Sequence, residues 1–157
     1  MSGPKTERQL SVAQQFLFLR NCEVCTGSGN LTNGHLIWRF KTCPTPMSRE
    51  YEIEIEYKQS DVPNVRVLQP DLIELAGDRD IPHVYRGPLR LCLYLPRKRQ
   101  WHAGLRIDQT IVPWTILWLY YFEEWLATNE WKGEGEHPNP DAPMEGNRRA
   151  RRMFRSY

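Results

Sequence analysis

The sequence predicts an α+β fold in which a first helix, an antiparallel meander of strands and a long second helix follow one another. Three patterns predict it. Residues 7–20 carry apolar side chains at helical spacing, residues 51–57 alternate between apolar and acidic side chains, and residues 114–126 are almost entirely apolar. At 157 residues the chain is long enough to form one domain that buries a core without disulfides or metal.

Three segments are expected to form the meander. Residues 35–41 alternate as one strand, residues 51–57 are the clearest strand in the chain, and residues 64–68 form a shorter third strand. We interpret the three glutamates of residues 51–57 as the solvated face of an antiparallel sheet, not as a cluster of carboxylates for catalysis. Residues 26–30, which read Thr-Gly-Ser-Gly-Asn, are expected to form a turn before the first strand.

The segment of residues 89–95 contains the most informative residue, Cys92. If this segment is extended, four leucines share one face and Cys92 shares the other with Arg90. Cys92 is then either a small hydrophobe of the core, as most free cysteines are, or a partly exposed thiolate. The basic run at residues 97–99 and Arg90 would stabilise such a thiolate and prepare it for nucleophilic attack.

The long helix is expected to begin between Asp108 and Thr110, with Pro113 in its first turn. One stripe of this helix is expected to face the core. The stripe consists of Trp114, Leu117, Trp118, Tyr121 and Trp125. Apolar residues also cover much of the remaining helix surface, which predicts burial on several sides or a face for a partner.

The four cysteines are expected to be thiols of a cytoplasmic protein. The first eight residues are polar and do not form a signal peptide, and the longest apolar block, residues 111–122, is too short to span a membrane. Cys22 and Cys25 have C-x-x-C spacing but lack a second close pair of Cys or His ligands, so we expect neither a metal site nor a cofactor. We interpret both cysteines as strand residues.

The composition changes at residue 132, so we divide the chain into a domain of residues 1–131 and a tail of residues 132–157. Glycine and proline interrupt the tail, and five arginines fall among residues 148–155. The arginines could contact nucleic acid or an acidic protein surface, or they could only keep the chain soluble. The net charge of +2 is too small to argue for nucleic acid by itself.

The order of these features resembles that of the ubiquitin-conjugating enzyme superfamily over residues 7–130. The corresponding features are a tyrosine-bounded strand (51–57), Pro63, a histidine turn (83–87), the Leu-Cys-Leu of residues 91–93, Trp101, and the start of a helix at Thr110 and Ile111. The chain is most similar to the stand-alone bacterial conjugating proteins of antiphage CBASS operons, as the tryptophan-rich helix and residues 131–138 indicate.

This resemblance implies a UBC-like fold with a catalytic-cysteine loop, and it implies a function. Cys92 would form a thioester with the C-terminus of a partner CD-NTase-type nucleotidyltransferase and transfer that acyl group to a target amine, usually a lysine. No membrane partner is expected.

An amine that attacks a thioester produces an oxyanion, which needs a hydrogen-bond donor worth about 3 kcal/mol. Eukaryotic members of the superfamily supply an asparagine from a His-Pro-Asn motif before the cysteine, but this chain has Pro82, His83, Val84 and Tyr85 there. His83 is therefore the candidate substitute, as a donor or as a residue that orients the loop. His102 and Asp108 are weaker candidates for lowering the proton affinity of the incoming amine.

Two alternatives remain open. Some members of the superfamily have lost catalysis and act as scaffolds, so the chain could bind the nucleotidyltransferase without reacting with it; such members typically lack the cysteine, whereas Cys92 is retained. A nucleic-acid adaptor would use the arginine tail, and its salt-dependent binding would disappear when residues 147–157 are deleted.

Overall fold

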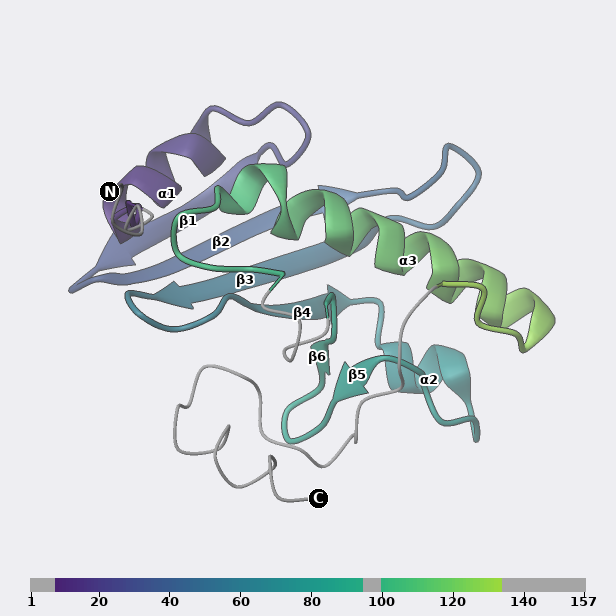
Figure 1. Cartoon of the computed structure of the whole chain (residues 1–157). Helices are drawn as coiled ribbons and strands as arrows, with labels where there is room; N and C mark the ends of the chain where they lie inside the picture. Colours follow the sequence, from purple (N-terminus) through teal and green to yellow (C-terminus); the bar gives the residue numbers. More distant parts are fainter. Residues whose placement is uncertain (1–7, 95–99, 134–157) are drawn as a thin grey trace, which may run out of the picture.

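The structure, a computed structural model, describes residues 8–94 and 100–133 and has the α+β architecture that the sequence predicts (Figure 1). Most of the predicted tail, residues 134–157, lies outside the described residues. The elements are α1 (Val12–Arg20), β1 (Gly27–Thr32), β2 (His35–Thr42), β3 (Tyr51–Lys58), β4 (Asn64–Gln69), α2 (Leu72–Ala76), β5 (Val84–Tyr85), β6 (Arg90–Leu91), the 3-10 helix η2 (Ile107–Gln109) and α3 (Ile111–Thr128).

Strands β1 to β4 form one antiparallel meander in chain order, and both long helices cover the same face of it (Figure 1). Alternation along β2 and β3 gives this face its buried side chains. They are Leu36, Trp38, Phe40, Tyr51, Ile53, Ile55 and Tyr57. Phe16 of α1 packs edge-on against Trp38, while Tyr51 donates a hydrogen bond to Glu123 of α3. The core therefore lies between this face of the sheet and the two helices.

The segment predicted to be a turn is instead strand β1. A Cβ atom at Gly27 would lie 1.9 Å from the carbonyl oxygen of Arg39, and one at Gly29 would lie 2.0 Å from that of Ile37. The glycines therefore allow close approach of β2, and they do not mark a chain reversal. The reversal occurs at Asn33 and Gly34, which both have positive φ angles, as a two-residue hairpin with an Asn-Gly turn requires.

Cys22 and Cys25 are not strand residues, because they lie in the turn between α1 and β1. Cys25 is fully buried, and its carbonyl accepts a hydrogen bond from the Trp38 indole at 3.0 Å. Burial raises the pKa of the Cys25 thiol strongly, and Cys22 and Asp108 raise it further. Cys25 is thus a neutral core residue. Within residues 8–94 and 100–133, no three His, Cys, Asp or Glu side chains are grouped so that they could hold a metal ion.

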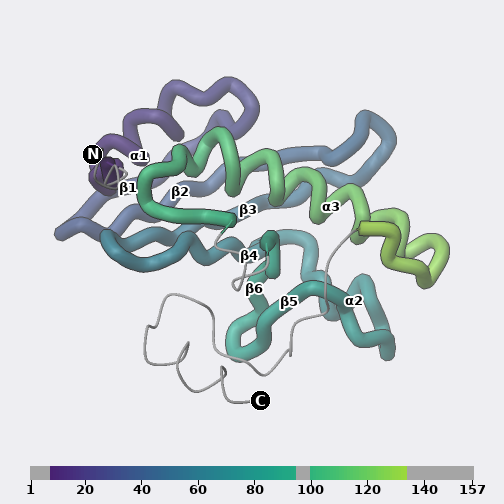
Figure 2. Tube along the Cα trace, in the orientation of Figure 1, coloured from purple at the N-terminus to yellow at the C-terminus, as the bar shows by residue number. Residues whose placement is uncertain are grey.

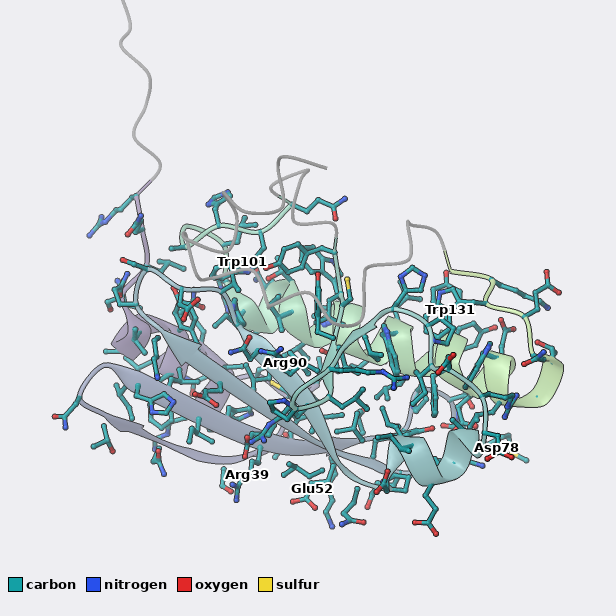
Figure 3. The ribbon with its side chains drawn as sticks, turned by 90° about the horizontal axis from the view of Figure 1, so that it is seen from below. Arg39, Glu52, Asp78, Arg90, Trp101 and Trp131 are labelled. Atoms are coloured by element: carbon teal, nitrogen blue, oxygen red, sulfur yellow. The ribbon has the colours of Figure 1, made fainter. Side chains whose placement is uncertain are left out.

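The glutamates of β3 do not form a simple solvated face, since the side chain of Glu54 is only 3% exposed. Its carboxylate accepts hydrogen bonds from Arg39 of β2, at 2.9 Å, and from Arg66 of β4. Burial raises the pKa of Glu54, but the two guanidinium groups outweigh it and leave that pKa below its usual value. Figure 3 shows Arg39 and Glu52 on the side of the molecule away from Trp101 and Trp131.

Helix α3 begins at Ile111, after the short helix η2, and holds Pro113 in its first turn as predicted. The predicted core stripe was right for Trp118 and Trp125, which are buried, but wrong for Leu117, which is 49% exposed. The buried residues of α3 are Ile111, Val112, Thr115, Trp118, Leu119, Phe122 and Trp125. A helix that is apolar nearly all round does not reveal from its pattern which stripe faces the sheet. None of the described helices is both long enough and apolar enough to cross a membrane.

Helix α1 begins at Val12, later than the predicted residue 7, because Ser11 and Gln14 form a capping box. Its Gln15 is fully buried and binds the segment that leads into α3. The Gln15 amide donates to the Leu105 carbonyl at 2.7 Å and accepts from the Ile107 N–H at 2.9 Å. These bonds fix the start of α3 against α1.

Candidate active site

The candidate site is built on the short β5–β6 hairpin, which lies beside β4 and α2 and next to α3 (Figure 2). Val84 pairs with Leu91, and both side chains are buried in the core. Tyr85 pairs with Arg90 in the neighbouring position, so both side chains point to the other face of the hairpin. Cys92 follows β6 directly and is two residues from Arg90, which places it on the face of Tyr85 and Arg90.

The extended segment predicted for residues 89–95 is much shorter in the structure, where only Arg90 and Leu91 among the described residues 89–94 are in a strand. The Cys92 N–H continues the ladder by donating to the His83 carbonyl at 3.0 Å. His83, however, has a φ angle of 52°, which is a left-handed conformation outside the strand region. The ladder ends there, and Cys92 begins a loop. The basic run at residues 97–99 lies outside the described residues.

The Cys92 residue is only 6% exposed, but its sulfur lies within hydrogen-bonding distance of two oxygen atoms. The sulfur Sγ lies 3.4 Å from the hydroxyl oxygen of Tyr85 and 3.4 Å from the carbonyl oxygen of Tyr94. Both distances are within hydrogen-bonding range for a thiol. The environment of Cys92 therefore differs from the hydrophobic pocket in which a cysteine serves only to fill space.

His83 connects the cysteine to α3 mainly through its backbone. Its carbonyl accepts hydrogen bonds from the Cys92 N–H and from the indole N–H of Trp118, each at 3.0 Å. The imidazole ring is buried and packs against Trp131, with 5.1 Å between the ring centroids. Trp131 also packs against Trp118 at 5.4 Å, and Figure 3 shows it near the end of α3. The structure thus brings together His83 and Cys92, the two site residues that the sequence predicted.

Tyr85 is the site residue that the sequence interpretation missed. In the sequence it is only one residue of the histidine turn and carries no signal of a role at the site. Its contact with Cys92 follows from the pairing of residues 84–85 with residues 90–91. Strands of two residues carry no periodic signal, so this pairing could not be read from alternation. The glycine and proline at 87 and 88, between the two short strands, were the available sign of a hairpin.

Comparison with protein families matches residues 15–138, most of the chain, to the family described as Type II CBASS E2 protein. The chain belongs to the Type II CBASS E2 protein family. It is therefore an E2-like, that is ubiquitin-conjugating-like, component of an antiphage CBASS system, and its α+β meander is the UBC-like fold of that family. A search of curated proteins gave no match.

In this Type II CBASS E2 protein, the two weaker candidates bind locally in the segment before α3. His102 Nδ1 accepts the Gly104 N–H at 3.1 Å. Asp108 is bound by the Arg106 guanidinium through both carboxylate oxygens, at 3.0 and 2.7 Å. The charge of Asp108 also raises the pKa of the Cys25 thiol. These bonds hold both residues within the segment that leads into α3.

Proposed function

We propose that this Type II CBASS E2 protein carries an acyl group on Cys92. The Cys92 sulfur would attack the activated C-terminal carbonyl of a partner CD-NTase-type nucleotidyltransferase and expel the activating group, forming a thioester. A target amine, usually a lysine, would then attack the same carbonyl. The C–S bond breaks, an amide forms, and the cysteine is released unchanged.

The observation that carries this proposal is the placement of Cys92 at the end of β6. Its N–H is held by the His83 carbonyl, and its sulfur lies against the Tyr85 hydroxyl. A thiol held by hydrogen bonds at both its backbone and its side chain has a defined direction of approach, which acyl transfer requires. The Type II CBASS E2 family match supports conjugating chemistry for such a thiol.

His83 is proposed as a residue that orients the cysteine. Its carbonyl is shared between Cys92 and Trp118, and its ring is packed against Trp131. These contacts favour the orienting role over the role of oxyanion donor, the other role that the sequence left open. The incoming acyl group would then be positioned by a turn that α3 holds in place.

The proposal is tested by incubating the protein with its partner nucleotidyltransferase and the activating components, followed by non-reducing electrophoresis. Wild type should give an adduct that reductant removes, Cys92→Ser should give a more stable ester or no adduct, and Cys92→Ala should give none. An adduct that persists in Cys92→Ala would place the nucleophile elsewhere and contradict the assignment.

The burial of Cys92 favours one alternative function, a scaffold that binds the nucleotidyltransferase without reacting with it. This alternative predicts that wild type binds the partner but forms no adduct, and that Cys92→Ala binds it equally well. Sedimentation of the two purified proteins measures the binding. The nucleic-acid alternative depends on residues 147–157, which lie outside the described residues.

A further inference from the structure

The contact between Tyr85 and Cys92 is the feature of the site that the orienting role of His83 does not explain. The two residues are each 6% exposed, and the phenol oxygen lies 3.4 Å from the sulfur. A thiol can donate its hydrogen to the phenol oxygen, but a thioester sulfur has no hydrogen to donate. Once Cys92 is acylated, only the phenol hydrogen can join these two atoms.

We propose that Tyr85 is a catalytic residue, whose hydroxyl donates a hydrogen bond to the Cys92 sulfur as the thioester breaks. This inference rests on the proposed function. When an amine attacks, the carbonyl carbon gains the C–N bond and loses the C–S bond, and the electron pair of that bond moves to the sulfur. The ammonium proton leaves to water, and Tyr85 keeps its own proton. The hydrogen bond is stronger to the departing thiolate than to the neutral thioester, so it accelerates the step.

Arg90 strengthens the phenol as a donor. It is paired with Tyr85 across the hairpin, so its guanidinium lies on the same face. Its Nε is buried and has no hydrogen-bond partner within the described residues. Burial lowers the pKa of Arg90 and Tyr85 opposes that shift, but a guanidinium stays charged in proteins. A cation beside the phenol stabilises negative charge on the phenol oxygen and on the departing sulfur. It thereby makes the phenol a stronger hydrogen-bond donor.

His83 and Tyr85 contact Cys92 at different atoms and therefore have different roles. Val84, between them, is buried in the core and anchors the strand. The His83 carbonyl is occupied by Cys92 and Trp118, while Tyr85 reaches the sulfur from the other strand of the hairpin. His83 therefore sets the position of Cys92, and Tyr85 contacts the atom at which the bond breaks.

The test separates loading of Cys92 from discharge. The full chain is loaded by exchange with a glycyl-peptide thioester of 2-mercaptoethanesulfonate, which needs no activating enzyme. Excess thioester is removed, free lysine is added, and intact-protein mass spectrometry follows the loss of the acyl group. The variants are Tyr85→Phe and, as a matched control, Tyr120→Phe, which removes a phenol that pairs with Glu124 on the exposed side of α3.

Wild type and Tyr120→Phe should load and discharge alike. Tyr85→Phe should reach the same final loading but discharge about 10- to 100-fold more slowly, as expected for loss of a hydrogen bond to a charged group. Discharge of Tyr85→Phe within twofold of wild type would overturn the role of Tyr85. Failure of wild type to load at Cys92 would instead contradict the proposed function.

A second pair of variants keeps the inference testable if Tyr85→Phe does not fold, which thermal denaturation will show. Arg90→Gln removes the charge beside the phenol, and Arg90→Lys retains it. Discharge should slow severalfold in Arg90→Gln and be largely restored in Arg90→Lys. Equal discharge rates for wild type and both variants would contradict the inference.

Discussion

At the scale of single residues, Cys92 and Cys25 show how two buried thiols of one chain can differ. Cys25 lies in the core, where burial raises its pKa and keeps it neutral. Cys92 is nearly as buried, but its sulfur faces a phenol and a carbonyl oxygen. Polar neighbours allow a sulfur to change charge during a reaction, whereas a hydrophobic pocket opposes that change.

The left-handed conformation of His83 leads to a prediction about its backbone. Glycine adopts this conformation without strain, whereas alanine does not. We therefore expect His83→Ala to be less stable than His83→Gly by about 1 kcal/mol, although both variants lose the ring contact with Trp131. Chemical denaturation of the two variants measures the difference. Equal stabilities would show that the turn does not hold residue 83 in this conformation.

Glu54 leads to a prediction about pH. Its pKa in the folded protein is below the usual glutamate value of 4.5, so its contribution to stability is present above that value. The contribution is lost as the pH falls through the lower folded pKa. Glu54→Gln should be less stable than wild type by about 1–3 kcal/mol at neutral pH, with a gap that narrows below pH 4.5.

Urea denaturation of wild type and Glu54→Gln between neutral and acid pH measures this gap. Glu52→Gln is the matched control, because Glu52 lies on the same face of the same strand. A gap that stays constant with pH would show that the ion pairs of Glu54 with Arg39 and Arg66 do not act through its charge.

At the scale of elements, α3 holds the site through contacts at several points along its length. Its start is fixed by the bonds of Gln15 to Leu105 and Ile107, and its middle supplies Trp118 to the His83 carbonyl. Its end is bound by Arg79, which donates to the carbonyls of Trp125 and Leu126 and lies over the Trp125 ring. A cation at the C-terminal end of a helix is stabilising. The loop that contains Cys92 is therefore bonded, through the His83 carbonyl, to a helix that is held in place at both ends.

This arrangement predicts that the indole N–H of Trp118 contributes to the site separately from the packing of the indole ring. Trp118→Phe removes the hydrogen bond to the His83 carbonyl. It should lower the free energy of unfolding by several kcal/mol at most, and it should slow thioester formation at Cys92. Trp125→Phe is the matched control, because it makes the same change about two helical turns further along the same buried stripe.

Peptide-thioester loading rates and denaturation curves of the two variants are compared. For a similar loss of stability, Trp118→Phe should lower the loading rate more than Trp125→Phe does. If both variants lose stability and loading rate to the same extent, Trp118 is only a core residue.

The elements that the sequence predicts well are those with long periodic patterns. Strands β2, β3 and β4 follow from alternation, and α3 follows from its apolar length. Strand β1 could not be predicted in this way, because its glycines indicate a turn in the sequence. In the folded sheet they instead let the backbone of β2 lie close to β1. Cys92 and His83 could be chosen from their order in the chain. The contacts of Tyr85 and Trp118 with the site could not, because they arise from strand pairing and from a bond across 35 residues.

At the scale of the whole molecule, the fold places one short hairpin beside β4, the last strand of the meander, and bonds the residue before it, His83, to Trp118 of the long helix (Figure 2). Val84 and Leu91 anchor one face of this hairpin in the core. The outer face of the sheet carries Arg39 and Glu54, which are joined by a hydrogen bond of 2.9 Å. The Type II CBASS E2 fold therefore serves, in our account, as a rigid support for a single acyl-carrying thiol.

The most direct test of this account is to locate the acyl group after the protein reacts with its activated partner. Peptide mapping by mass spectrometry under non-reducing conditions distinguishes Cys92 from the exposed Cys43, which any reactive acyl donor can reach more easily. We expect the acyl group on Cys92, with unchanged labelling in Cys43→Ser and loss of labelling in Cys92→Ala. Labelling confined to Cys43, or unchanged in Cys92→Ala, would contradict it.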